Sequence, residues 1–93
     1  MKRHDTFHVY IVKCVDGKLY TGYSSNLENR IKQHNAGQGS KYVKLRLPVQ
    51  LVYAKEYKYY KNALHAEQNL KKLTKIKKEV LIKNYARENK SNG

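Results

Sequence analysis

Two segments rich in strand-forming residues flank an Asp-Gly pair near the start of the chain, and this arrangement constrains the fold more than any other feature. The segments are 7–14 and 19–23, and Asp16-Gly17 lies between them. β-Branched and aromatic residues favour strands, and an Asp-Gly pair favours a tight turn. The sequence therefore predicts a β-hairpin at this end of the chain.

The length of the hairpin loop decides which side chains share a face of the sheet. A two-residue loop would pair Val15 with Lys18. In that register Tyr10 and Tyr20 lie on opposite faces. A three-residue loop with its glycine in the left-handed conformation pairs Cys14 with Lys18 and places both tyrosines on one face. We predict the three-residue loop.

A helix is expected to follow the hairpin. Ser25 and Glu28 have the spacing of a capping box, residues 27–34 have helical periodicity, and Gly37 ends the segment. The inward stripe of this helix by spacing consists of Leu27, Arg30, Ile31 and His34. Burying an unpaired charge is costly, so the polar members of the stripe should pair with other groups or line a cleft.

Residues 49–57 predict a third strand, because apolar side chains recur at every second position. One face of this strand would carry Val49, Leu51, Tyr53 and Lys55, and the other Gln50, Val52, Ala54 and Glu56. Before it, residues 37–48 are expected to form a loop with a helical turn near Tyr42.

Two more helices are expected after the third strand. The first, 62–73, has the apolar stripe Ala63, Ala66, Leu70 and Leu73, and Glu67 lies within that stripe. Thr74 can cap the second, which runs to about residue 87, and residues 88–93 are expected to fray. Its inward residues by spacing are Ile76, Val80, Leu81 and Tyr85.

These elements, in the order ββαβαα, predict an α/β (α+β) fold with a small three-stranded antiparallel sheet and flanking helices. The 93 residues suit a single domain over 1–93, with a core over about 7–83. Cys14 is the only cysteine in the sequence, so we expect it to be a small buried residue outside any disulfide framework. The sequence has neither a membrane-span pattern nor a signal-peptide pattern, and we expect a cytoplasmic protein.

The charge of the chain indicates a polyanionic partner. Twenty Lys and Arg residues against seven Asp and Glu give a formal net charge of +13, which is typical of proteins that bind nucleic acid. We expect DNA, with RNA less favoured; an anionic membrane surface and simple solubility are the alternatives. The residues expected to contact phosphates are Lys41, Lys44, Arg46, Lys71, Lys72, Lys75, Lys77 and Lys78. A solvated basic face is the alternative for this set.

Five polar residues are expected to face inward, and they form the candidate site: Tyr10, Tyr20, Arg30, His34 and Glu67. Each also has a structural explanation. Tyrosines in strands are often core aromatics, and His34 near a helix end can complement the helix dipole. Arg30 and Glu67 can pair with each other, or Glu67 with Lys71 one helical turn on. The coincidence of all five favours a functional site.

The spacing of the two tyrosines resembles a known nuclease signature. His8-Val9-Tyr10 and, after nine residues, Tyr20-Thr21-Gly22 resemble the two-part motif of the GIY-YIG nuclease superfamily. Arg30 and Glu67 match the arginine and the metal-binding glutamate of that superfamily. The resemblance covers roughly residues 7–83.

A closer likeness is to small stand-alone bacterial members of poorly defined role. It is carried by Leu19-Tyr20-Thr21-Gly22, Arg30-x₃-His34-Asn35-x-Gly37 and the stretch through Lys41-Tyr42. The chain departs from the superfamily pattern where His8 replaces the first glycine and where Tyr23 stands at a position that is lysine in excision-repair relatives. The asparagine that many members carry after the glutamate has no clear counterpart. These departures bear on activity more than on fold.

The resemblance implies a metal-dependent endonuclease that hydrolyses DNA phosphodiester bonds, with structure-selective cutting in DNA repair or recombination as a role. Glu67 would hold a single Mg²⁺ or Mn²⁺ ion that stabilises the leaving 3′ oxygen. Arg30 would hold the phosphate, and Tyr10 would position the nucleophile or a phosphate oxygen. A phenol with a pKa near 10 acts as a base at neutral pH only if its anion is stabilised by about 4 kcal/mol. Tyr20 and His34 are therefore both open as the general base.

Two other functions are open. The chain can be a non-catalytic nucleic-acid-binding module, or a subunit that cuts only with a protein partner that supplies specificity. It can also be a basic RNA-associated protein whose tyrosines belong to the core, and this alternative predicts a closed ion pair between Arg30 and Glu67.

Overall fold

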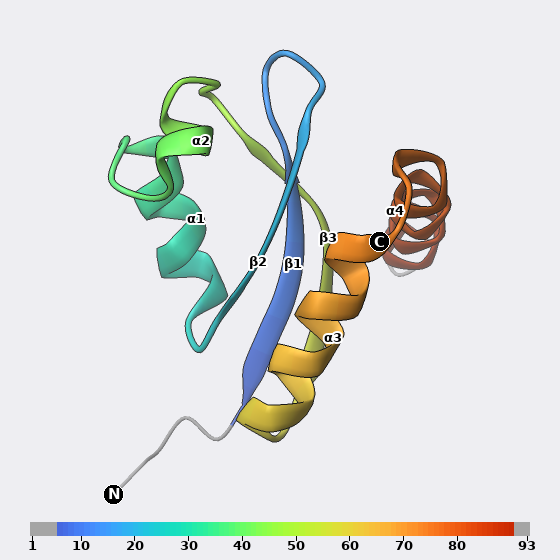
Figure 1. The fold of residues 1–93 in the computed structure, drawn as a ribbon. Coiled ribbons are helices and arrows are strands. Elements are labelled where there is room, and N and C mark those ends of the chain that lie inside the picture. The colour runs from blue at the N-terminus through green and yellow to red at the C-terminus, as the bar shows by residue number, and fades with distance from the viewer. Residues whose placement is uncertain (1–5, 91–93) are drawn as a thin grey trace, which may run out of the picture.

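A three-stranded antiparallel sheet in the order β2-β1-β3 forms the centre of the computed structural model, which describes residues 6–90 (Figure 1). The strands are β1 (Phe7–Lys13), β2 (Leu19–Ser24) and β3 (Gln50–Tyr57). The helices are α1 (Leu27–Asn35), α2 (Lys41–Lys44), α3 (Tyr60–Lys72) and α4 (Lys75–Lys90). The fold class and the element order are confirmed, with the helical turn near Tyr42 present as α2.

The central strand β1 is buried on both faces, because helices cover each side of the sheet. Tyr10 and Val12 pack toward α1 and α2, in a cluster with Val43. Val9 and Ile11 pack toward α3 and α4. The period of two along a strand therefore assigns alternate β1 side chains to the two halves of the core.

The hairpin has the predicted three-residue loop. Gly17 N donates to Cys14 O at 2.9 Å, Cys14 N donates to Lys18 O at 2.8 Å, and Gly17 has a φ of +87°. A φ in this range favours glycine because it has no Cβ. The register pairs Tyr10 with Gly22, so Tyr10 and Tyr20 share a face of the sheet as expected.

The predicted alternation of β3 is wrong beyond its first residues. The pairing with β1 passes from Ile11 opposite Tyr53 to Val12 opposite Leu51, so Val52 is an extra residue in a β-bulge. A bulge reverses which side chains face which layer. Leu51 therefore packs toward α1, whereas Tyr53 packs toward α3 and α4.

Helix α1 begins one residue later than the capping-box prediction implies. The N-cap is Asn26, whose Oδ1 accepts from Asn29 N at 3.1 Å, so Ser25 does not cap the helix. The end is as expected, because Gly37 N donates to His34 O and the helix stops there. The predicted inward stripe holds, and His34 is its most buried member.

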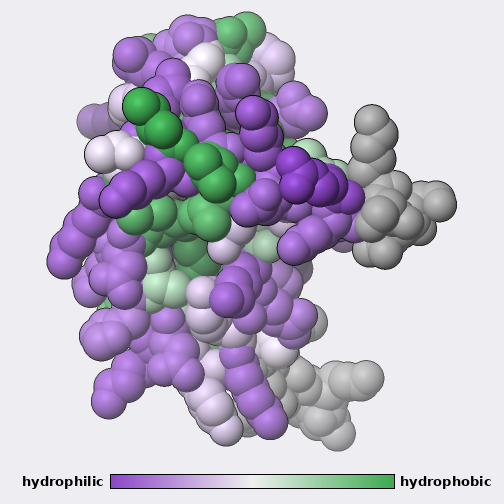
Figure 2. Space-filling model, turned by 90° about the vertical axis from the view of Figure 1, so that its right-hand side faces the viewer, coloured by the Kyte–Doolittle hydropathy of each residue, from purple (hydrophilic) through white to green (hydrophobic). Residues whose placement is uncertain are grey.

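The inward face of helix α4 is predicted correctly at Leu81 and Tyr85 but wrongly at Ile76 and Val80. Thr74 caps the helix as expected, since its Oγ1 accepts from Lys77 N at 3.2 Å. Leu81, Ile82 and Tyr85 pack inward. Ile76 and Val80 were expected inward but are 76% and 53% exposed. Figure 2 shows the face that carries α4, where hydrophobic atoms interrupt a largely hydrophilic surface.

The chain end is more ordered than predicted, because α4 continues through residues 88–90 instead of fraying; residues 91–93 lie outside the described part. Cys14 is buried and free of disulfide bonds, as expected. Within residues 6–90, none of the helices is long and apolar enough to cross a membrane.

Candidate active site

A buried hydrogen bond between β1 and α1 forms the centre of the candidate site. Tyr10 Oη lies 2.8 Å from His34 Nε2, and the two rings meet edge to face with centroids 5.9 Å apart. Both residues have 0% exposed surface. The backbone of Gly39 lies against the other ring nitrogen of His34. The site thus begins as a closed polar contact inside the core.

Tyr20 extends this contact toward the surface from strand β2. Its ring lies edge to face against His34 with a centroid distance of 5.4 Å, and it stacks with the ring of Tyr42 at 6.3 Å. Tyr20 is half-buried and Tyr42 is 40% exposed. Tyr42 was not among the predicted site residues. The sequence signals for it were its position in the expected helical turn and in the stretch through Lys41-Tyr42.

Gly22 makes the close approach of Tyr10 to strand β2 possible. A Cβ at position 22 would lie 2.6 Å from Tyr10 Oη and 2.8 Å from its Cζ, closer than atoms can pack. The glycine of the Tyr20-Thr21-Gly22 motif is therefore explained by contact with the other tyrosine of the signature.

Arg30 lies beside the Tyr10–His34 pair on α1. Its Nη1 donates to Gln33 Oε1 at 3.2 Å, and the side chain is half-buried. Burial raises the pKa of Tyr10, while Arg30 opposes this rise through hydrogen bonding and charge. Burial lowers the pKa of His34, and the charge of Arg30 lowers it further. Both buried groups are therefore held in their neutral forms at neutral pH.

Glu67 approaches from α3, on the opposite face of the sheet from α1. It is 8% exposed, and its Oε2 lies 3.2 Å from Lys71 Nζ. Its charge adds to the rise in the pKa of Tyr10, as does that of Tyr20. The Glu67 charge therefore acts on Tyr10 although Glu67 belongs to another layer. Arg30 and Glu67 do not form the ion pair that the RNA-associated alternative predicts.

The acidic residues around the site suit one hard cation better than two. Within the described part of the chain, His, Cys, Asp and Glu side chains nowhere gather in groups of three or more that could hold a metal ion. Mg²⁺ is often held by one or two carboxylates, with water and substrate phosphate as its other ligands. The Glu67 carboxylate fits that arrangement, and a bound ion would compete with the Lys71 ammonium for it.

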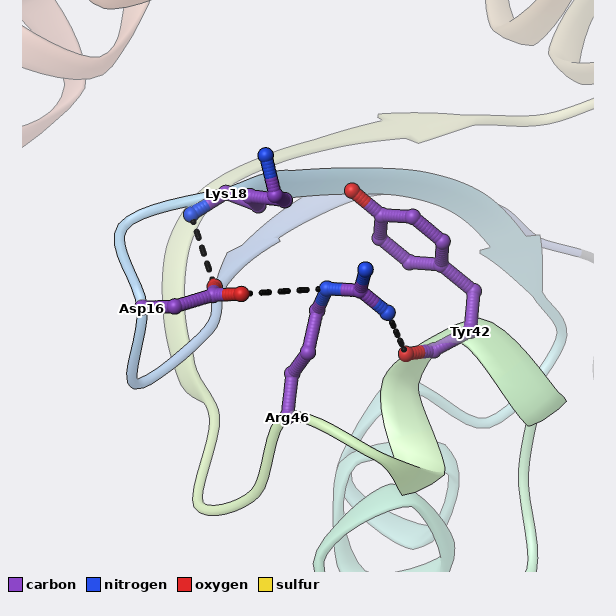
Figure 3. Close-up of polar contacts among 4 residues, drawn as sticks. All are labelled: Asp16, Lys18, Tyr42 and Arg46. Atoms are coloured by element: carbon purple, nitrogen blue, oxygen red, sulfur yellow. Dashed lines mark hydrogen bonds and ion pairs between the residues drawn. The ribbon is translucent and has the colours of Figure 1, made fainter.

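The predicted phosphate-contacting residues fall into groups with different surroundings. Arg46 is engaged within the protein: its Nε lies 3.1 Å from Asp16 Oδ2 and its Nη1 donates to Tyr42 O at 2.8 Å (Figure 3). Its guanidinium also lies 4.0 Å from the centroid of the Tyr42 ring. Lys71 pairs with Glu67. The remaining members, all exposed except the half-buried Lys78, are Lys41, Lys44, Lys72, Lys75, Lys77 and Lys78.

Sequence reasoning missed the structural role of Asn35. Its Oδ1 accepts from Val49 N at 2.8 Å and its Nδ2 donates to Val49 O at 3.2 Å. This pair of bonds ties the end of α1, and with it His34, to the start of β3. The signal available in the sequence was the place of Asn35 directly after His34 in the Arg-x₃-His-Asn-x-Gly segment.

An exposed aromatic group beside Glu67 was also missed. Tyr23 Oη lies 3.3 Å from Tyr60 Oη, and Phe7 packs edge to face on Tyr60 with centroids 5.6 Å apart. The bond to Tyr60 raises the pKa of Tyr23, and the charge of Glu67 adds to the rise. Tyr60 and Glu67 are seven residues apart on α3, a spacing that places them on one helical face.

Comparison with known proteins decides the family. A family model described as the GIY-YIG catalytic domain matches residues 6–80. The chain belongs to the GIY-YIG family. It is 51% identical over 79 residues to a UPF0213 protein of Staphylococcus aureus strain Mu3, a match that covers 85% of this chain and 96% of that protein. A UPF0213 protein of S. aureus strain MW2 matches with the same identity and coverage.

Two solved structures of bacterial proteins have a similar fold. A UPF0213 protein from Bacillus halodurans has 38% identity and a TM-score of 0.56, covering 84% of this chain and 83% of that one. A protein from E. faecalis has 33% identity and a TM-score of 0.61, covering 91% of each chain. The expected resemblance to small stand-alone bacterial proteins is confirmed. GIY-YIG membership indicates the nuclease class, with DNA as substrate and a divalent metal as the general cofactor.

Proposed function

We propose that this GIY-YIG protein is a metal-dependent endonuclease that hydrolyses DNA phosphodiester bonds, with structure-selective cutting in DNA repair or recombination as its role. The observation that carries the proposal is the cluster in which Tyr10 Oη lies 2.8 Å from His34 Nε2 and the Tyr20 ring packs on His34 with a centroid distance of 5.4 Å. Arg30 lies one helical turn before His34 on α1. A net charge of +13 supports a polyanionic substrate.

Tyr20 is the better candidate for the general base. His34 has no exposed surface, its Nε2 is bonded to Tyr10, and burial lowers its pKa. It therefore does not reach a water molecule in the surrounding solvent. Tyr20 is half-buried and lies between His34 and the surface. In this mechanism the phenolate form of Tyr20 removes a proton from the attacking water. The water oxygen then bonds to the phosphorus of the phosphate held by Arg30, and the bond from phosphorus to the 3′ oxygen breaks.

Tyr10 and His34 act as positioning residues in this proposal. Their hydrogen bond fixes α1 against β1, and Arg30 and His34 lie one helical turn apart on α1. Fixing the helix fixes the direction in which the guanidinium points at the phosphate. Glu67 would hold the divalent ion, for which Mg²⁺ is our first choice and Mn²⁺ the second. The ion supplies charge neutralisation at the phosphate and at the leaving 3′ oxygen.

Nicking of supercoiled plasmid and cleavage of branched DNA, with and without Mg²⁺, test the proposal. We expect the native protein to cut only with the metal, and Glu67→Gln and Arg30→Ala each to lose about a hundredfold or more of the rate. Glu79→Gln and Arg87→Ala are matched controls, since both are exposed residues of α4, and both should cut like the native protein. Equal nicking by all five proteins would show contamination and refute the assignment.

The ion pair between Glu67 and Lys71 favours one alternative, a subunit that cuts only with a protein partner. In this alternative the 3.2 Å contact keeps the carboxylate occupied until a partner or substrate displaces the ammonium. The variant Lys71→Met distinguishes a partner-dependent nuclease subunit from a non-catalytic DNA-binding module. A gain in metal-dependent cutting by this variant supports a site held back by Lys71, whereas binding of DNA without cutting by both proteins supports the non-catalytic module.

A further inference from the structure

A hollow beside the hairpin turn brings together three separate segments of the chain. It has a volume of about 230 Å³ and is lined by Lys18, Leu19, Tyr42, Lys75 and Lys78. Lys18 and Leu19 lie at the start of the edge strand β2, Tyr42 lies on α2, and the last two residues lie at the start of α4. Elements from both faces of the sheet therefore meet around its edge.

The lining of this hollow is strongly cationic and lacks a compensating carboxylate. Its three ammonium groups belong to Lys18, Lys75 and Lys78, and among residues 6–90 none of them forms an ion pair. Lys78 is half-buried, whereas Lys18 and Lys75 are exposed. Three amines held close together without counter-charges raise one another's electrostatic energy, and a bound anion would relieve that repulsion.

Contacts of Asp16 and Arg46 hold Tyr42, the aromatic residue of the lining, in place. Asp16 Oδ1 accepts from Lys18 N at 3.1 Å, and Asp16 Oδ2 pairs with Arg46 Nε at 3.1 Å. Arg46 in turn bonds to the backbone of Tyr42 and covers its ring, as Figure 3 shows. The Asp16 carboxylate is therefore engaged by Arg46 and by the backbone of the turn, and it does not line the hollow. The contacts of Arg46 hold the Tyr42 ring in a fixed orientation.

Tyr42 connects the hollow with the candidate active site. Its ring stacks with Tyr20 at 6.3 Å and also lines the hollow. A ligand in the hollow therefore lies next to a residue that touches the proposed base. Phosphate suits the lining, because its oxygens accept hydrogen bonds from ammonium and phenol groups and its charge matches the site.

We propose that the hollow bounded by Lys18, Tyr42, Lys75 and Lys78 binds a phosphate group of DNA, as a second anchor beside the site of cleavage. The inference rests on the proposed function in taking DNA as the source of the phosphate. The phosphate is either an internal diester of the strand or the terminal monoester of a strand end. With the cut phosphate at Arg30 and another in the hollow, a strand would run past Tyr20 and Tyr42.

Titration of the ¹⁵N-labelled protein, followed by amide chemical shifts in EDTA, tests the hollow without any need for cleavage. The probes are the dinucleotide TpT, thymidine 5′-monophosphate and thymidine. We expect saturable shifts at Lys18, Tyr42, Lys75 and Lys78 with a phosphate-bearing probe and none with thymidine. Saturation by TpT assigns an internal phosphate, and saturation by the monophosphate alone assigns a strand end.

Paired variants show whether the lining lysines bind the phosphate. Lys75→Ala/Lys78→Ala should weaken binding of the responding probe about tenfold. Lys32→Ala/Lys83→Ala removes the same charge from exposed positions outside the hollow and should leave the affinity within about twofold. Equal loss in both pairs, shifts spread over all lysines, or no response to either phosphate would overturn the proposal. Because EDTA prevents metal-dependent cutting, absence of nuclease activity would leave a positive titration intact.

Discussion

The substitution Gly22→Ala tests the arrangement of the candidate site most directly, because one methyl group is aimed at its buried centre. The new Cβ would lie 2.6 Å from Tyr10 Oη, 2.8 Å from Cζ and 3.2 Å from Cε2. The Tyr10 ring is fully buried between β2 and α1, and its hydroxyl is bonded to His34. The ring therefore has little free space into which it can retreat.

The expected cost has two parts. Overpacking a core by a methyl group costs about 1–3 kcal/mol. Displacing the hydroxyl from His34 Nε2 leaves a buried polar atom unpaired, which costs about 1–3 kcal/mol more. Together these give a destabilisation of about 2–6 kcal/mol, or a fall in Tm of roughly 10 °C or more for a domain of this size. Cleavage should fall with it, because α1 and Arg30 lose their fixed position.

A double-mutant cycle isolates the contact with the hydroxyl. In a Tyr10→Phe background the shortest contact is absent, so Gly22→Ala should cost about 1 kcal/mol less than in the native protein. Gly17→Ala is the matched control, because nothing lies within 4 Å of its Cβ and its cost arises from the φ of +87° alone. Urea unfolding followed by circular dichroism measures the native protein and the four variants. A change below about 0.5 kcal/mol for Gly22→Ala, or costs that simply add, would refute the reasoning.

Three further predictions concern the pH dependence of stability, the hydrogen bonds between Asn35 and Val49, and Tyr20 as the general base. Burial lowers the pKa of His34 from its ordinary value of 6.5, so the unfolded chain gains a proton first as pH falls. The free energy of unfolding should decline below about pH 6.5. In His34→Gln, Tm should change less between about pH 7.5 and pH 5 than it does in the native protein, and parallel curves of Tm against pH for the two proteins would contradict this. Asn35→Ala should cost about 1–3 kcal/mol in urea unfolding, because Val49 N loses its acceptor; no loss would contradict the tie. Tyr20→Phe should retain the native Tm and TpT affinity but lose about a hundredfold in single-turnover cleavage; native cleavage would exclude Tyr20 as the base.

Much of the site could be predicted because it depends on short-range rules. The Asp-Gly loop and the period of two fixed the register that places Tyr10 and Tyr20 together. Helical spacing placed His34 on the buried stripe of α1. These relations involve neighbouring residues, so local patterns contain the information they require.

Other features depended on packing between distant segments. The bulge at Val52 reversed the expected faces of β3, and no local pattern marked it. Apolar residues occur around several sides of α4, so periodicity alone could not choose between Ile76 and Ile82 for the inward face. Contact with the sheet made that choice. The engagement of Arg46 by Asp16 likewise joins a turn and a loop that are far apart in the sequence.

The sequence by itself determined the order of the elements, the hairpin register and the set of polar residues that face inward, because each follows from local periodicity or turn chemistry. The tertiary structure alone decided how those residues meet. It placed Tyr10 and His34 in a hydrogen bond between two fully buried side chains. It brought the charge of Glu67 from the other face of the sheet close enough to act on the Tyr10 hydroxyl. It also placed Lys18, Lys75 and Lys78 in one hollow with Tyr42. The physical reason is that burial and charge at a site depend on every layer packed around it.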